Sequence, residues 1–146
     1  MLLAVILTST LLSLCSAQGQ ACSSWTGILD VNFLLKKLQK DPASGCSCNS
    51  HGTSCLCLPI PSDNCTTPCF HEGLSQIINV TQNTGRKLIF YRVKRAVEVL
   101  KYNKCPSFSC EQPCNQTMAG NTMTFLRTLL ETFQKAKRGM RGKMWR

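Results

Sequence analysis

Cysteine and histidine are the residue types in this chain with the greatest scope for chemistry, and many of them lie in one polar segment, 41–69. The C-x-C pairs in this segment allow two interpretations: disulfide cross-links, or a metal site with His51 as the nearby non-sulfur ligand. Zinc sites commonly use C-x-x-C spacing, so disulfides are favoured and no metal ligand is predicted. The cysteines of the segment are Cys46, Cys48, Cys55, Cys57, Cys65 and Cys69.

The two histidines, His51 and His71, raise the question of acid–base catalysis. A ribonuclease-like reaction needs a general acid and a general base on either side of a phosphate. Two histidines so close in sequence, in an otherwise helical pattern, do not favour that arrangement. The chain also has no phosphate-binding glycine loop and no G-x-S-x-G motif. The sequence therefore predicts no enzyme, no catalytic residue and no cofactor.

Residues 1–19 are uncharged, largely apolar and end in small residues, which predicts a secretory signal peptide. The mature domain would then span 20–146. No second long apolar run follows, so we expect a secreted protein without membrane insertion. Cys15 would leave with the signal, so 11 − 1 = 10 cysteines would remain for disulfides. The additional ones are Cys22, Cys105, Cys110 and Cys114.

The sequence leaves the pairing of these cysteines open, although their number limits it. Seven mature cysteines lie at or before Cys69 and three lie at or after Cys105. If all pair within the chain, at least one disulfide must join the two regions.

The net charge of +10 is unevenly distributed. Residues 20–85 carry three bases and four acids, whereas residues 86–146 carry fourteen bases and three acids. In a secreted protein, a basic tail at about 135–146 would meet sulfated glycans or acidic receptor surfaces before nucleic acid. A solvated, frayed terminus is the alternative for this tail. A glycosaminoglycan-binding or antimicrobial helical protein is the alternative function that such a charge distribution suggests.

Apolar residues recur at helical spacing in four stretches, which predicts helices at 26–40, 68–83, 86–103 and 117–137. Thr67 is the expected N-cap of the second helix. Inward positions are expected to include Ile28, Val31, Leu35, Leu38, Phe70, Leu74, Ile77, Ile89, Val93, Val97, Ala119, Leu126, Leu129 and Phe133.

The lengths of the connections predict the topology of an all-α four-helix bundle. The first connection, of about 26 residues, is long enough to let the second helix run parallel to the first. The second and third helices are joined tightly, so they are antiparallel. The last connection reaches at most about 40 Å, which makes a parallel fourth helix feasible but taut. We therefore expect the up-up-down-down order, with a plain antiparallel second pair as the alternative.

Several residues are expected at the surface. Leu29 and Phe33 fall opposite the core face of the first helix, either as a contact patch or under the long connection. Gly120 would weaken a helix by about 1 kcal/mol, which suggests that a neighbour approaches closely there. Three sequons predict N-glycosylation at Asn64, Asn79 and Asn115.

The segments GILDVNFLLKKLQKDPAS, TSCLCLPIPSDNCT, VEVLKYNKCP and SFSCEQPCNQTMAGN resemble a known family. They identify the chain as similar to the short-chain four-helix cytokines that signal through the common gamma chain. The number of cysteines in the mature chain also matches the number in the family member that it resembles. The resemblance implies a monomeric growth and differentiation factor for lymphoid and mast cells. It would bind a private alpha receptor and the common gamma chain, and so activate Janus kinases.

The resemblance also implies where the receptors bind. The family pattern places the alpha receptor on the first and third helices, and the gamma chain on the first and fourth. Carried onto this chain, the first surface comprises Leu29, Phe33, Lys37, Tyr91, Lys94 and Arg95. The second surface comprises Arg127, Glu131 and Gln134.

Overall fold

The computed structural model describes residues 22–48, 55–61, 66–110, 112–114 and 118–144. The predicted signal peptide lies outside these residues. None of the described helices combines the length and apolar character that a membrane crossing requires.

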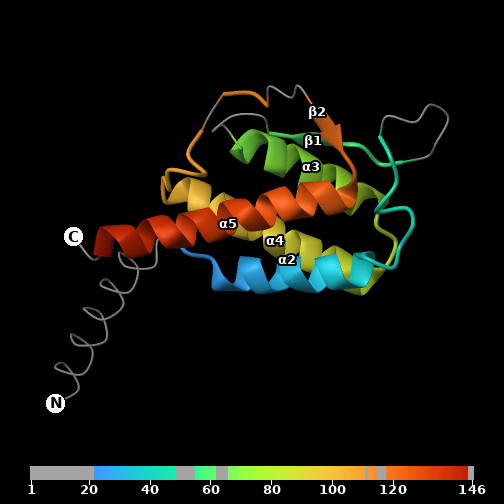
Figure 1. The fold of residues 1–146 in the computed structure, drawn as a ribbon, viewed down its shortest axis with the longest axis horizontal. Helices are drawn as coiled ribbons and strands as arrows, with labels where there is room; N and C mark the ends of the chain where they lie inside the picture. Colours follow the sequence, from blue (N-terminus) through green and yellow to red (C-terminus); the bar gives the residue numbers. More distant parts are fainter. Residues whose placement is uncertain (1–21, 49–54, 62–65, 111, 115–117, 145–146) are drawn as a thin grey trace, which may run out of the picture.

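Four helices form the body of the molecule: α2 (Trp25–Leu38), α3 (Thr67–Val80), α4 (Thr84–Tyr102) and α5 (Thr122–Met144). Figure 1 shows α2 and α3 running in one direction and α4 and α5 running back. The predicted four-helix bundle with up-up-down-down order is therefore confirmed. The basic tail predicted from about residue 135 continues α5 as far as Met144.

Polar side chains cap the starts of α2 and α4. Ser24 caps α2 by accepting a hydrogen bond from the Gly27 amide at 3.0 Å. Asn83 caps α4 in the same way, accepting from the Arg86 amide. The predicted cap of α3 is wrong, because Thr67 is already helical and its buried hydroxyl has no partner among the described atoms. Thr66 precedes it and donates its hydroxyl to the Ser107 carbonyl at 2.7 Å.

A short antiparallel ribbon joins the two long connections, where the sequence predicted no strand. It consists of β1 (Leu58–Ile60) and β2 (Met118–Gly120), with Leu58 opposite Gly120. The helix predicted from residue 117 therefore begins only at Thr122, and Ala119 is exposed on β2 instead of buried. Gly120 does have a close neighbour, since a Cβ there would lie 2.8 Å from Cγ1 of Ile60.

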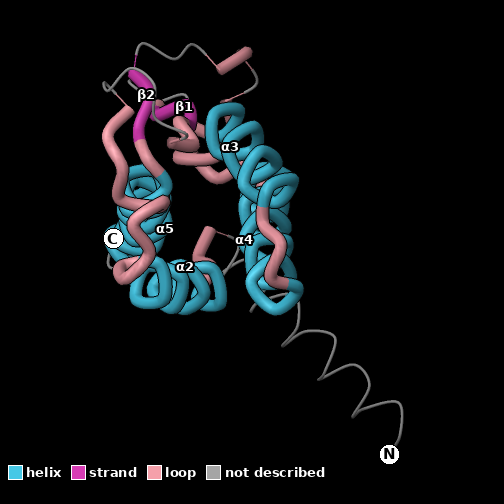
Figure 2. Tube along the Cα trace, turned by 90° about the vertical axis from the view of Figure 1, so that its right-hand side faces the viewer, coloured by secondary structure: helices cyan, strands magenta, loops and turns pink. Residues whose placement is uncertain are grey.

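The helices surround the core in the order α2, α4, α3, α5. α2 packs against α4 and α5, α3 packs against α4, and β1 packs against both α3 and α5. Figure 2 shows the ribbon over the space between α3 and α5. The ribbon therefore covers one side of the bundle, and the side formed by α2 and α4 lies opposite.

Phenylalanine side chains dominate the core. The Phe70 ring centroid lies 5.9 Å from that of Phe125 and 6.4 Å from that of Phe108. Phe108 also stacks on Phe133 at 5.5 Å, although it belongs to the connection between α4 and α5. Leu34 is fully buried and the expected Leu35 only partly, because the core face of α2 is rotated slightly from its predicted position.

Disulfides cross-link the connections to the helices. Cys22 pairs with Cys105, and Cys69 pairs with Cys114, so two bonds join the early and late cysteines. Cys110 is also disulfide-bonded, and Cys65 lies outside the described residues. Two further bonds close the first connection on itself: Cys46–Cys55 and Cys48–Cys57.

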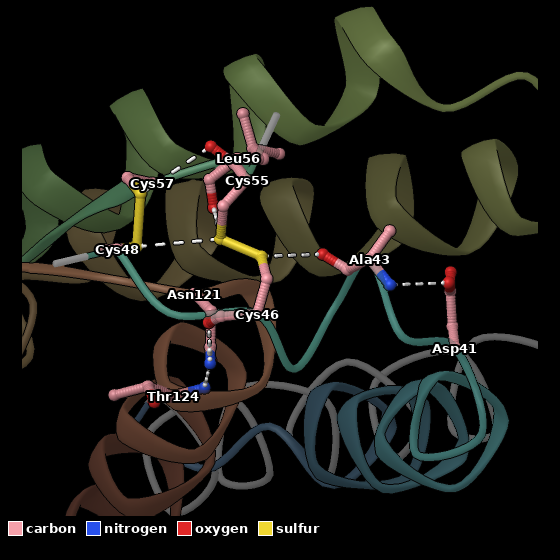
Figure 3. Close-up of a disulfide and its surroundings, with 9 residues drawn as sticks. All are labelled: Asp41, Ala43, Cys46, Cys48, Cys55, Leu56, Cys57, Asn121 and Thr124. Atoms are coloured by element: carbon pink, nitrogen blue, oxygen red, sulfur yellow. Dashed lines mark hydrogen bonds between the residues drawn. A yellow bond between two sulfur atoms is a disulfide. The ribbon is translucent and has the colours of Figure 1, made fainter. Parts of the chain in front are cut away.

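Hydrogen bonds attach this cross-linked connection to the start of α5 (Figure 3). The Asn121 side-chain amide donates to the Cys46 carbonyl at 2.7 Å, and its oxygen accepts from the Thr124 amide at 2.9 Å. The Met123 amide donates to the Ser44 carbonyl. The loop is therefore held against the helix that it crosses.

Candidate functional site

The sulfur atoms considered for a metal site lie close together because two disulfides lie side by side. Sγ of Cys48 is 3.9 Å from Sγ of Cys55, and Cys57 completes the group (Figure 3). Each of these sulfurs is bonded to another sulfur, whereas a zinc ligand is a thiolate. The arrangement is therefore that of a cross-link.

Of the two histidines considered for acid–base chemistry, the structure describes His71. His71 on α3 has its Nδ1 3.8 Å from Oε1 of Glu98 on α4, and both side chains are about half exposed. His51 lies outside the described residues. This pair resembles a surface ion pair, which contributes little and sets up no proton transfer to a bound group.

The outer face of α2 exposes large apolar side chains at intervals of one helical turn. Leu29 is 49% exposed and Phe33 is 44% exposed, so the long connection does not cover them. Nζ of Lys37 lies 5.5 Å from the centroid of the Phe33 ring, which is within the range of a cation–π contact. Three residues predicted for the first receptor surface thus share one helix face.

A groove of about 790 Å³ runs between the first half of α2 and the last half of α4. It brings together two residues predicted from the sequence, Leu29 and Arg95. Tyr91 is exposed one turn before Arg95. Lys94 is half-buried and, by its helical position, lies on the α3 side of α4 with Lys101, so it does not join the groove. The predicted set is therefore divided between two sides of α4.

The groove also contains residues that the sequence reasoning missed. Trp25 and Val99 line it and are both exposed. Leu88 and Val99 belong to one stripe of α4 with Arg92 and Arg95, since these positions recur every three or four residues. This spacing is visible in the sequence, although basic residues interrupt the apolar positions of the stripe.

A bidentate ion pair between Arg92 and Asp30 forms part of the lining of the groove. Arg92 donates from Nε to Oδ2 of Asp30 at 3.1 Å, and from its terminal nitrogen to Oδ1 at 2.6 Å. The hydrogen bond and then the charge of Asp30 raise the pKa of Arg92 above its ordinary value. The pair joins α2 to α4 and leaves Arg92 with its charge matched.

The second predicted surface lies on α5. Arg127, Glu131 and Gln134 are all exposed and follow one another along its outer face. Lys137, on the α2 side of this helix, places Nζ 4.1 Å from the Trp25 ring centroid. The role of these residues stays a prediction.

Of the three predicted glycosylation sites, only Asn79 belongs to the described residues. It is exposed near the end of α3. Asn64 and Asn115 lie outside the described residues. An Asn79 glycan would project from α3 and therefore away from the α2–α4 groove.

Comparisons with known proteins identify the relatives of this chain. The sequence profile of the family described as Interleukin-9 matches residues 1–129. The chain is 67% identical to Interleukin-9 of Homo sapiens over 145 residues, which cover 99% of this chain and 100% of the relative. It is 58% identical to Interleukin-9 of Mus musculus over 137 residues, which cover 94% of each protein.

Proposed function

The chain belongs to the interleukin-9 family, and we propose that it acts as this secreted cytokine by joining two receptor chains. The first is the interleukin-9 receptor alpha chain, and the second is the common cytokine receptor gamma chain. Bringing the two chains together activates the Janus kinases bound to their intracellular parts. The protein itself performs no reaction.

The single observation that supports this proposal is the apolar surface left open on the α2–α4 side. Leu29, Phe33, Leu88 and Val99 are all exposed there, between basic side chains. A monomeric protein that exposes apolar side chains together on one side commonly uses that side to bind a partner. We assign this surface to the alpha chain, with Leu29, Phe33, Lys37 and Arg95 among its contacts.

The gamma chain would bind the neighbouring side, formed by α2 and α5. Arg127, Glu131 and Gln134 present polar groups there. Because α2 is shared by both sides, one rigid bundle would hold the two receptors at a fixed angle. Disulfides support such rigidity and lower the cost of ordering on binding.

Sequential binding tests the proposal. The oxidised protein spanning 20–146 is passed over immobilised alpha-receptor ectodomain, and gamma-chain ectodomain is added afterwards. We expect the gamma chain to be captured only where the alpha receptor already holds the cytokine. Binding to heparin with no binding to either receptor would overturn the proposal in favour of a glycan-binding factor.

A further inference from the structure

The charges around the α2–α4 groove are not balanced. The Asp30 side chain is only 14% exposed and is covered by Arg92, so this acid is already paired. Among the described residues, Arg95 makes no ion pair, although it lines the same groove. The groove therefore presents one uncompensated guanidinium to a partner.

The surface beside Arg95 is apolar. Trp25, Leu29 and Val99 line the groove and are exposed by 57%, 49% and 46%. Interface hot spots commonly combine an aromatic or aliphatic side chain in a pocket with a charged pair that becomes shielded from water. The groove, of about 790 Å³, is large enough to admit a large apolar side chain of a partner. A carboxylate of the same partner would then lie next to Arg95.

The end of the groove is fixed covalently. Cys22 precedes α2 and Cys105 follows α4, and their disulfide ties these two helix ends together. Together with the Arg92–Asp30 pair, this bond holds the two walls of the groove at a set separation. A partner side chain would enter a site that is largely formed in advance, which lowers the ordering cost of binding.

We propose that the receptor chain bound by α2 and α4 places a carboxylate against Arg95 and inserts an apolar side chain between Trp25, Leu29 and Val99. This inference rests on the proposed function and adds the chemistry of the receptor surface. Arg95 is the anchoring cation, and Arg92 is a positioning residue that acts through Asp30. The partner is an acidic protein surface with an apolar protrusion.

A pair of charge reversals on α4 tests the electrostatic part. Arg95→Glu should weaken binding to the alpha-receptor ectodomain about 100-fold or more, because a desolvated charge pair becomes a like-charge contact. Lys101→Glu makes the same change in net charge, but Lys101 lies on the α3 side of the helix. It should change the affinity less than about threefold. Circular dichroism and thermal unfolding establish that both variants are folded.

A pair of valines tests the apolar part. Val99→Ala in the groove should weaken binding about threefold or more, whereas Val80→Ala, at an exposed valine of α3, should leave the affinity unchanged. If the groove variant and its control lost the same affinity for the alpha receptor, in either the charged pair or the valine pair, the inference would be overturned. Such a result would indicate a general effect of charge or stability. Unchanged binding by Arg95→Glu would also overturn it. If the unaltered protein binds no alpha receptor, the proposed function fails as well.

Discussion

Opposite sides of this bundle differ in what covers them. The α3–α5 side carries the β1–β2 ribbon, whose residues Leu58 and Ile60 are themselves buried against the two helices. Among the described residues, no ribbon of this kind covers the α2–α4 side (Figures 1 and 2). Its outer apolar side chains are exposed. Both sides are built from amphipathic helices, so helix sequence alone does not explain the difference.

The difference comes from the long connections. In an up-up-down-down bundle both must cross the length of the molecule, and here they meet over α3 and α5. Their disulfides and apolar residues extend the core on that side. The α2–α4 side is thereby left as uncovered helix surface. Such a surface is rigid and therefore suited to contact a partner. One side mainly supplies stability, and the other is the side that we propose for receptor binding.

The largest expected effect comes from the Cys22–Cys105 bond, which serves both stability and binding. Replacing both cysteines by Ala should lower the free energy of unfolding by roughly 4 kcal/mol, because the bond closes a long loop in the unfolded chain. It should also weaken alpha-receptor binding, since the end of the groove is no longer fixed. Denaturant unfolding and receptor titration measure the two effects.

The matched control is the removal of Cys46–Cys55, whose cysteines are only 9 residues apart. This change should cost about 2–3 kcal/mol of stability and leave receptor affinity unaltered in the folded protein. Loss of affinity in the control alone would reverse the assignment of the two sides.

A smaller effect on stability is expected for a substitution on the α3–α5 side, where the β1–β2 ribbon lies. Gly120→Ala would place a methyl group 2.8 Å from Cγ1 of Ile60, so the free energy of unfolding should fall by about 1–3 kcal/mol. Gly45→Ala is the control, since nothing lies within 4 Å of the position that its Cβ would take. That variant should be as stable as the parent or slightly more so. Similar unfolding curves for both would show that the ribbon is not closely packed.

The smallest effect on stability is expected for a substitution on the α2–α4 side. Phe33→Ala should change the free energy of unfolding by less than about 0.5 kcal/mol, because Phe33 is 44% exposed and lies outside the buried core. The same change should weaken alpha-receptor binding by more than about 1 kcal/mol. Met118→Ala, at an exposed residue of β2, is the control and should alter neither quantity. A loss of stability without a loss of affinity would count against Phe33 as a contact.

The sequence predicted those features that depend on local periodicity. The exposure of Leu29 and Phe33 followed from their angle on one helix, and the topology followed from the lengths of the connections. The pairing of Ile60 with Met118 could not be predicted, because three-residue strands carry too little alternation to be recognised. Phe108 was missed for a similar reason, since a buried residue within a connection has no period around it.

The sequence predicted two residues that line the groove, Leu29 and Arg95, but not the groove itself. Arg92 and Arg95 are the same residue type on neighbouring turns, and only the structure shows that Asp30, 62 residues before Arg92, pairs with one of them. Such a long-range pair leaves no local pattern in a single sequence. The three-dimensional arrangement was therefore needed to distinguish Arg92, which pairs with Asp30, from Arg95, which makes no ion pair among the described residues.

Hydroxyl-radical footprinting of the alpha-receptor complex is the most direct test of the division between the two sides. Mass spectrometry would compare the oxidation of exposed side chains in the free and bound cytokine. We expect protection of Trp25, Leu29, Phe33 and Leu88, and unchanged oxidation of Val80 and Met118. Protection of Val80 and Met118 with the α2–α4 residues still fully reactive would contradict this account.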